Sequence, residues 1–534
     1  MTIDPDDVDP VTIDPDDVEA GGAPSSGETR NVRTIFAGIL IGLSIAAISQ
    51  TLVTTALPTM VGELGGFDKL SWVISAYLLT SAIVVPFAGK LSDLFGSTRL
   101  FQLAIVVFAA GSLLAGLSNS MVLLIVARGI QGIGGGAIMT VAFTLVAHIV
   151  PARERGRYQG YITSLFAVTS IAGPLVGGFF VDHLTWRWAF YLNVVLSAVA
   201  IVVVRRNLPP DSSRPSKGVD QLGAALLVVT LVSVMLVAVW GGQQYAWSSP
   251  VIGALAIVAV VGAVAFIRCE RVAAEPIVPL ELFRHRVVRV ATILGFLTGV
   301  TMFGVIVYTP TYLQVSLGVS ATASGLLLIP LMSSILIGST FGGRAMSRTG
   351  RYKSLAVAGS AVLAVGAGLL ATTGVGTALY LPSAYVGLVG LGLGLTLPVT
   401  LVAVQHVVSK EQLGAATSTN QFARKMGSTL GVAALGGIFS GRVSSRLVGG
   451  SNPLPAGTTP DSVLESPAAI DQLPAATADA VRTAVADGSS LVFAVAFVIA
   501  VIALVVSVRL PDDRLDDDDL DAAADDRTRT AVDQ

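Results

Sequence analysis

Hydrophobic residues occur along this chain in long runs, separated by short segments that are polar or contain glycine and proline. Fourteen runs come close to the roughly 20 residues that an α-helix needs to cross the hydrocarbon core of a bilayer. Because hydrocarbon offers no hydrogen-bond partner to backbone groups, each run is predicted to be helical. The runs span approximately 34–57, 71–89, 100–118, 121–147, 158–181, 187–204, 221–240, 250–268, 290–312, 322–342, 354–373, 379–405, 413–440 and 489–508.

The composition agrees with a membrane location. Hydrophobic residues make up 53% of the 534 residues, charged residues make up 13%, and the mean hydropathy is +0.75. A soluble protein of this length has too small an interior to hide so much apolar side chain. We therefore predict an all-α, multi-pass protein of the cell (plasma) membrane.

The net charge of −2 hides an uneven distribution of charge. Acidic residues concentrate in 1–33 and 510–534, so the membrane part between them is basic. Basic residues gather in alternate connections between the runs, whereas the connections near 241–249, 313–321 and 374–378 carry none. By the positive-inside rule the basic connections and both termini are predicted to be cytoplasmic, which an even number of helices also requires.

A constant shift of 254 residues indicates that the chain contains two copies of one unit. Duplicated helical bundles with a site between the copies are typical of secondary transporters. The matching positions are Gly89 with Gly343, Asp93 with Ser347, Gly96 with Gly350, Gly160 with Gly414, Gly173 with Gly427 and Gly177 with Gly431.

The repeats and the charge pattern predict five regions along the chain. Two of them are acidic cytoplasmic tails, and the three between them form the membrane part. In order they are a disordered tail 1–33, a six-helix bundle 34–206, two inserted helices with linkers 207–288, a second six-helix bundle 289–509 with an extracellular loop 441–488, and a tail 510–534.

Two glycine-containing motifs are candidates for conformational roles. In the segment 89–99 the glycines allow a tight turn, and Asp93 is placed to cap a helix or to pair with a basic residue. In the run at 158–181 small residues share one face with a proline, as expected of a bending helix at a bundle interface. Ordinary capping and ordinary packing are the alternatives. The residues are Gly89, Asp93, Gly96, Arg99, Gly173, Pro174, Gly177 and Gly178.

Polar residues inside the runs are candidates for a substrate or coupling cavity. The charges of Arg128 and Arg424 are unfavourable in hydrocarbon unless each faces water or a partner. Gln131 lies one turn from Arg128, and Gln421 lies one turn from Arg424. Lys425 is interpreted as an interruption of the packing. Further candidates, each also explicable as a satisfied helix hydrogen bond, are Ser49, Gln50, Thr54, Tyr308 and Gln314.

Five motifs in order along the chain resemble a known family. GKLSDLFG (89–96) and RGIQGIGGGA (128–137) resemble signatures of the major facilitator superfamily, and GPLVGG (173–178) resembles the motif of its drug antiporters. TLVTTALPT (51–59) and WRWAFYLN (186–193) resemble the fourteen-helix drug:proton antiporters. The resemblance covers about residues 34–510. It implies two six-helix bundles plus two inserted helices, and coupling to a proton gradient.

Departures from this family leave the coupling ion open. Ser49 stands where the family often has an acid, and none of the fourteen runs contains Asp or Glu. A buried carboxylate is the usual proton carrier. A cavity whose embedded charges are all positive is expected to tolerate neutral or anionic amphiphiles better than dications.

We therefore predict a monomeric secondary active efflux transporter that exports lipophilic small molecules by alternating access. Alternatives are a lipid or metabolite exporter of the same fold, and a membrane receptor or scaffold that transports nothing. An enzyme is disfavoured because the four histidines lack metal-ligand spacing, and an ATP-driven pump because no phosphate-binding loop occurs. Since Cys269 is the only cysteine, we expect neither a disulfide nor a thiolate metal site. No cofactor and no nucleic-acid partner are expected.

Overall fold

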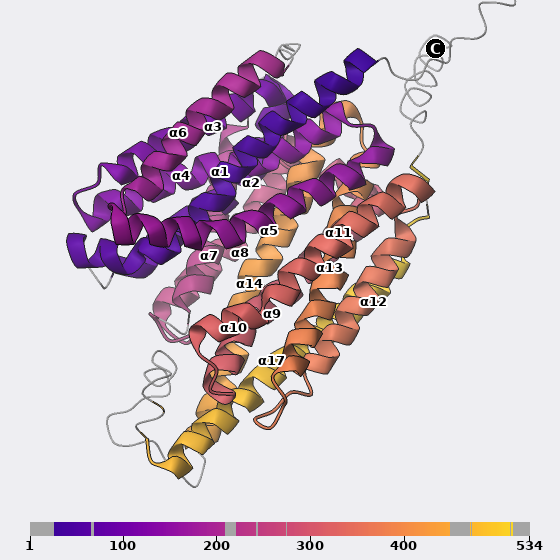
Figure 1. Cartoon of the computed structure of the whole chain (residues 1–534). Helices are drawn as coiled ribbons and strands as arrows, with labels where there is room; N and C mark the ends of the chain where they lie inside the picture. Colours follow the sequence, from indigo (N-terminus) through magenta and orange to yellow (C-terminus); the bar gives the residue numbers. More distant parts are fainter. Residues whose placement is uncertain are drawn as a thin grey trace, which may run out of the picture.

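The computed structural model describes residues 26–65, 69–208, 220–241, 244–273, 275–448, 470, 473–512 and 514–515. These residues are almost entirely helical, and the only β-type pairing among them consists of two isolated bridges. Figure 1 shows two groups of long helices, one coloured indigo to magenta and the other salmon-red to yellow, which lie against each other. The fold is therefore all-α, as predicted.

Six long helices form the N-terminal half of the molecule, two form an inserted pair, and the remainder form the C-terminal half. The N-terminal half contains α1 (Ser26–Leu64), α2 (Leu70–Phe95), α3 (Ser97–Gly116), α4 (Met121–Ile149), α5 (Ala152–His183) and α6 (Trp188–Asn207). The inserted pair is α7 (Gln221–Trp240) and α8 (Pro250–Val272). The C-terminal half contains η3 (Leu280–Arg284), α9 (Arg286–Thr311), η4 (Tyr312–Ser316), α10 (Ala321–Leu327), α11 (Ile329–Thr349), α12 (Lys353–Leu370), α13 (Tyr380–His406), η5 (Lys410–Gln412), α14 (Leu413–Val448) and α17 (Ala475–Val508).

Thirteen spans among the described residues are long and apolar enough to cross a membrane. α14 is not one of them, because polar residues such as Asn420, Arg424 and Lys425 lower its hydropathy. It nevertheless has 36 residues and packs against α2, α9 and α17. α14 therefore corresponds to the predicted run at 413–440.

The ends of three helices differ most from the predicted boundaries. α1 begins at Ser26, inside the predicted tail 1–33, while residues 1–25 lie outside the described part. α14 continues to Val448, and α17 begins at Ala475, so both ends of the predicted loop 441–488 are helical. Ala484 and Val485 are buried, which explains why the helix continues through a segment of low hydrophobicity.

Local sequence explains several helix starts. The side chains of Ser120, Asp220 and Ser249 accept backbone N–H groups in the first turns of α4, α7 and α8. Such caps satisfy donors that have no partner within the helix.

Each half of the molecule buries its own apolar core, one around Phe101 and Phe108 and the other around Leu393 and Phe493.

The two halves meet through two helix pairs that are related by the internal repeat. α2 packs against α14, and α5 packs against α11. The 254-residue shift carries Gly89 of α2 onto Gly343 of α11 and Gly160 of α5 onto Gly414 of α14. One contact is therefore the repeat-related counterpart of the other, as expected for two copies that face each other.

The inserted pair lies at the boundary between the halves (Figure 1). α7 contacts α8, α2 and α14. Its buried residues Leu227, Leu231 and Met235 share one apolar cluster with Ala82 of α2 and Met426 of α14. The insertion therefore covers one side of the α2–α14 contact.

Candidate functional site

The two halves are joined at the end of the molecule that carries Arg99, Arg153, Arg344 and Arg351, which we call the basic end. Here the carboxylate of Asp93, near the end of α2, accepts the backbone N–H groups of Gly414 and Ala415, both at 2.8 Å. These N–H groups belong to the first turn of α14, where a helix has free donors and a positive dipole end. The acid of the GKLSDLFG motif thus ties α2 to the opposite half.

The turn behind Asp93 depends on Gly96, which joins α2 to α3 with φ at 93°. This backbone conformation strains residues that have a Cβ atom. Arg99 lies exposed on the first turn of α3.

Glycines allow the backbones of the two halves to touch at the basic end. A methyl group on Gly89 would overlap the side chain of Ser418 and the carbonyl of Gly414. A methyl group on Gly343 would overlap the carbonyl of Gly156. Gly89 and Gly343, which the repeat relates, therefore have the same role: each allows two helices to come into backbone contact.

Hydrogen bonds from arginine and glutamine complete the closure. Arg155 is buried and donates to the carbonyl oxygens of Val150, Ala147 and, across the halves, Gln405 at 3.2 Å. Gln405 donates to the carbonyl of Phe143 at 3.4 Å and to the Thr417 hydroxyl at 2.9 Å. Arg153 donates to the carbonyl of Ser347 at 3.1 Å. The basic end is therefore closed.

Arg128 and Gln131 lie inside the N-terminal half. Arg128 is 2% exposed, donates from Nε to the Val73 carbonyl at 3.2 Å and also donates to Gln131. Its guanidinium lies 4.4 Å from the centre of the Tyr77 ring. The Gln131 amide in turn donates to Ser49 at 3.1 Å and to Ser112 at 2.7 Å. Arg128, Gln131 and Ser49 thus form one internal network that connects α1, α2, α3 and α4.

Gln421 and Arg424 have a different environment. They lie on the same face of α14 as Thr417, which belongs to the closed basic end, but one and two turns farther along the helix. Gln421 is 7% exposed, yet its side-chain nitrogen has no hydrogen-bond partner in the part of the chain that the structure describes. Arg424 is half-buried. The neighbouring Lys425 donates to the hydroxyl of Ser81 on α2, so it joins the halves. The sequence interpretation of Lys425 as an interruption of packing missed this contact.

The other cavity candidates do not come together at one place. Tyr308 is buried, donates to the Val432 carbonyl at 3.5 Å and packs against Phe439, all within the C-terminal half. Gln314 donates to Ser324 at 3.0 Å, and Gln50 is half-buried. The side chain of Thr54 lies outside the described residues.

The glycines of the GPLVGG motif have unequal surroundings. Gly173 lies against Thr51 of α1, so a methyl group there would overlap the threonine side chain. Gly177 is buried, whereas Gly178 has open space where a methyl group would project. The Pro174 side chain lies outside the described residues.

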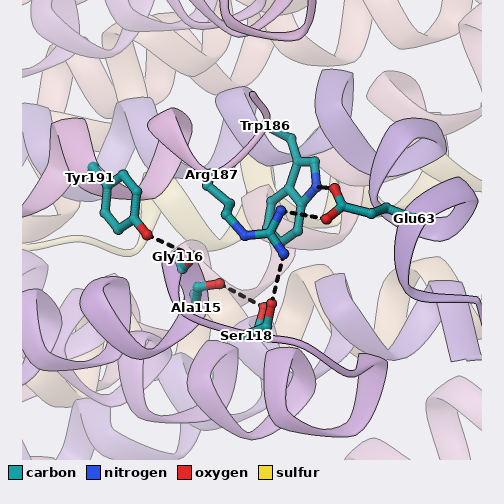
Figure 2. Close-up of polar contacts among 7 residues, drawn as sticks. All are labelled: Glu63, Ala115, Gly116, Ser118, Trp186, Arg187 and Tyr191. Atoms are coloured by element: carbon teal, nitrogen blue, oxygen red, sulfur yellow. Dashed lines mark hydrogen bonds and ion pairs between the residues drawn. The ribbon is translucent and has the colours of Figure 1, made fainter. Parts of the chain in front are cut away.

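The WRWAFYLN motif ties together the end of the N-terminal half that lies opposite the basic end (Figure 2). Glu63 at the end of α1 accepts hydrogen bonds from Trp186 Nε1 at 2.5 Å and from Arg187 at 2.6 Å. Arg187 also donates to the Ser118 carbonyl at 3.1 Å, and Tyr191 donates to Gly116 at 3.0 Å. These donors lower the pKa of Glu63, chiefly through the bond from Arg187.

The sequence reasoning also missed a pair that anchors the inserted helices. Lys90 lies in the GKLSDLFG motif, is 8% exposed and forms an ion pair with Glu275 at 2.6 Å. The position of Lys90 between Gly89 and Asp93 did not indicate its partner, because Glu275 lies 185 residues away along the chain. No local pattern could have paired them.

Comparison with known proteins identifies the family. The family model of the Major Facilitator Superfamily matches residues 39–432. An uncharacterized MFS-type transporter of Mycobacterium tuberculosis is 40% identical over 509 residues, which cover 95% of this chain and 73% of the relative. The multidrug transporter protein MdtP of Bacillus subtilis is 36% identical and covers 83% of this chain and 85% of the relative.

Solved structures show the same fold. The human organic anion transporter MFSD10 superposes with a TM-score of 0.59 at 16% identity, covering 88% of this chain and 99% of that chain. The proton:xylose symporter XylE superposes with a TM-score of 0.60 at 12% identity, covering 91% of this chain and 98% of that chain. The family model and the transporter relatives, together with the membrane-spanning helices, confirm a non-enzymatic, multi-pass transporter of the cell membrane. The chain therefore belongs to the major facilitator superfamily.

Proposed function

We propose that this transporter exports lipophilic small molecules of varied structure, with proton influx as the driving force. Relatives with multidrug names support the substrate type: besides MdtP, multidrug resistance protein 3 of Bacillus subtilis is 34% identical over 417 residues. The mainly apolar helices, with few polar groups, suit loose selection by hydrophobic contact.

The observation that carries this proposal is the closure at the basic end. It consists of backbone-to-backbone contacts at Gly89 and Gly343 and of hydrogen bonds around Asp93 and Gln405. Such contacts form and break as units when two rigid halves rock against each other. If the basic end is cytoplasmic, as the charge pattern predicts, the structure represents the state that is closed to the cytoplasm.

The test is efflux from bacteria that lack their main exporters. Cells with the transporter are loaded with ethidium, rhodamine 6G or the neutral dye Nile red and are then energised with glucose. We expect faster loss of at least one dye than in cells without the transporter, and collapse of this difference with a protonophore. Asp93→Asn is expected to slow efflux about tenfold, because the neutral amide weakens the bond to the α14 N-terminus.

Two outcomes would contradict parts of the proposal. Equal dye retention with and without the transporter, for every dye, would favour a lipid exporter or a protein without transport activity. Efflux that persists in the presence of the protonophore, but stops when sodium is removed, would replace the proton as the coupling ion.

A further inference from the structure

The two arginines in the middle of membrane-spanning helices have opposite surroundings. Arg128 is fully enclosed, and its guanidinium contacts a carbonyl, an amide oxygen and an aromatic ring. Arg424 lies about three turns into α14, is half-buried, and within the described part of the chain its guanidinium has no hydrogen bond, ion pair or ring partner. Because an unpaired charge at this depth is costly, Arg424 requires water or an anion.

The position of Arg424 relates it to the contact between the halves. Thr417, Gln421 and Arg424 are spaced by four and three residues, so they share one face of α14. Thr417 accepts a hydrogen bond from Gln405, which also contacts Phe143 of the N-terminal half. Gln421 and Arg424 therefore continue the face that closes the basic end, one and two turns farther toward the opposite end.

Gln421 is the second group of this face without a partner. It is only 7% exposed, and its amide nitrogen donates to no atom of the described residues. A buried amide donor without an acceptor is unfavourable, because it has lost its hydrogen bonds to water and gained none in return. The Gln421 amide and the cationic Arg424 guanidinium, one turn apart on α14, thus both lack an acceptor among the described residues.

The surrounding charges do not supply that acceptor. Lys425 follows Arg424 directly and contacts only the neutral Ser81 hydroxyl among the described side chains. The predicted run at 413–440 contains no acidic residue, and the other thirteen runs contain none either. A bound ligand with an anionic group would therefore meet two positive charges and no carboxylate from any of the fourteen runs.

We propose that Arg424 and Gln421 form a subsite that binds the carboxylate or sulfonate group of an amphiphilic substrate, whose apolar part lies along the neighbouring helices. Lys425, on the side of α14 that faces α2, adds to the positive potential of this subsite. This proposal rests on the proposed export function and specifies its substrate class as amphiphilic anions. The bidentate geometry of a guanidinium fits a carboxylate or sulfonate better than a neutral group.

The experiment compares three fluorescent ligands that share one apolar part: 11-(dansylamino)undecanoic acid, its methyl ester and its trimethylammonium analogue. Binding to the purified full-length protein in lipid nanodiscs is followed by dansyl fluorescence. We expect the acid to bind tightest. In Arg424→Gln the affinity for the acid should fall by roughly tenfold, because a charge-assisted hydrogen bond is lost, while affinity for the ester stays within about twofold.

Three further variants make the result specific. Arg424→Lys keeps the charge and is expected to retain an intermediate affinity for the acid, and Gln421→Leu to lose less than Arg424→Gln. Arg442→Gln removes an exposed arginine from the same helix and should change nothing. If Arg424→Gln does not fold, the proposal is tested by the affinities of Arg424→Lys and Gln421→Leu for the acid, each compared with the affinity of Arg442→Gln.

The proposal is overturned if the protein prefers the ammonium ligand, if none of the ligands binds, or if the variants weaken all three ligands equally. The last result would assign a structural role to Arg424. Export of Nile red by the wild-type protein, measured separately, shows whether the proposed function itself stands. Export of Nile red without preference for the acid would refute the anion subsite alone.

Discussion

At the scale of single residues, side chains of the same type have different roles in this transporter. Arg128 contacts only its own half, Arg155 bonds across to Gln405, and Arg424 has no protein partner among the described residues. A sequence motif identifies such residues, but their partners distinguish a structural arginine from one that can bind a ligand. The same holds for glycines.

Gly343 and Gly178 provide a matched pair of glycines. Alanine at Gly343 would collide with the carbonyl of Gly156, whereas alanine at Gly178 would project into open space. Overpacking costs about 1–3 kcal/mol, and here the cost falls on the closed state alone. We therefore expect Gly343→Ala to reduce dye efflux roughly tenfold and Gly178→Ala to leave it unchanged. Equal effects of the two variants would show that the Gly343–Gly156 contact is not important for transport.

Glu63 gives a prediction about pH. Because its pKa lies below the ordinary value of 4.5, its bonds to Arg187 and Trp186 stabilise the fold above that pH, and the contribution disappears as the pH falls through the lowered pKa. Glu63→Gln should therefore lower the unfolding temperature slightly at neutral pH, and the difference should vanish in acid. The effect is small because the Glu63 side chain is 48% exposed.

A consequence concerns proton transport. A carboxylate with a lowered pKa stays ionised near neutral pH, so Glu63 is a poor proton carrier there. The pH profile of efflux between about pH 6 and pH 8 should be the same in Glu63→Gln and wild type. A profile shifted in the variant would assign a coupling role to Glu63.

At the scale of elements, the inserted pair is attached to the N-terminal half by its linker as well as by its apolar face. Buried Glu270 at the end of α8 accepts the N–H groups of Ile277 and Val278, both at 3.2 Å. Lys90 of α2 then holds Glu275 in the same linker. The linker is therefore a fixed element, not merely a tether between α8 and η3.

We expect Lys90→Met to destabilise the protein by roughly 1–3 kcal/mol, because the ion pair is only partly exposed and its loss leaves Glu275 without a counter-charge. The double exchange Lys90→Glu with Glu275→Lys should recover part of this loss. Thermal unfolding in detergent measures both. Arg446→Met, which breaks a more exposed pair with Asp487, is the control and should have little effect. No recovery in the double exchange would contradict the pairing.

At the scale of the whole molecule, the two copies face each other through contacts that the repeat duplicates. The duplication is not perfect, since Asp93 of the first copy corresponds to Ser347 of the second. Asp93 receives two N–H groups of α14 through its side chain, whereas Ser347 receives Arg153 through its backbone carbonyl. The α2–α14 contact is therefore closed by an anionic side chain, whereas the α5–α11 contact is closed by a cationic one.

Spin labels at Glu154 and Arg344, both exposed at the basic end but in opposite halves, report whether the halves separate there. In a Cys269→Ser background, electron–electron double resonance should show one short distance in the closed state. Asp93→Asn should add a second, longer distance, because it weakens the closure. Labels at Arg99 and Glu154, which belong to one half, should keep a single distance. A single distance for both pairs in every variant and with every dye would argue against alternating access.

Hydrophobic patterning alone was sufficient to predict the all-α membrane fold, and the motifs in their order were sufficient to predict the family. The reason is that spanning helices satisfy their backbone hydrogen bonds locally, so that their number and type depend on nearby residues. The prediction missed where α14 ends and where α17 begins; burial of Ala484 and Val485 against other helices extends α17 beyond its hydrophobic stretch.

The partners of the charged residues were decided only by the tertiary structure. Asp93 with Gly414, Lys90 with Glu275 and Lys425 with Ser81 each join residues more than 180 positions apart. Sequence spacing carries no information about such pairs, since they depend on how two rigid bundles dock. The sequence by itself thus determined which residues are costly in a membrane, and the docking of the helices determined which of them are paired and which, like Arg424, have no partner among the described residues.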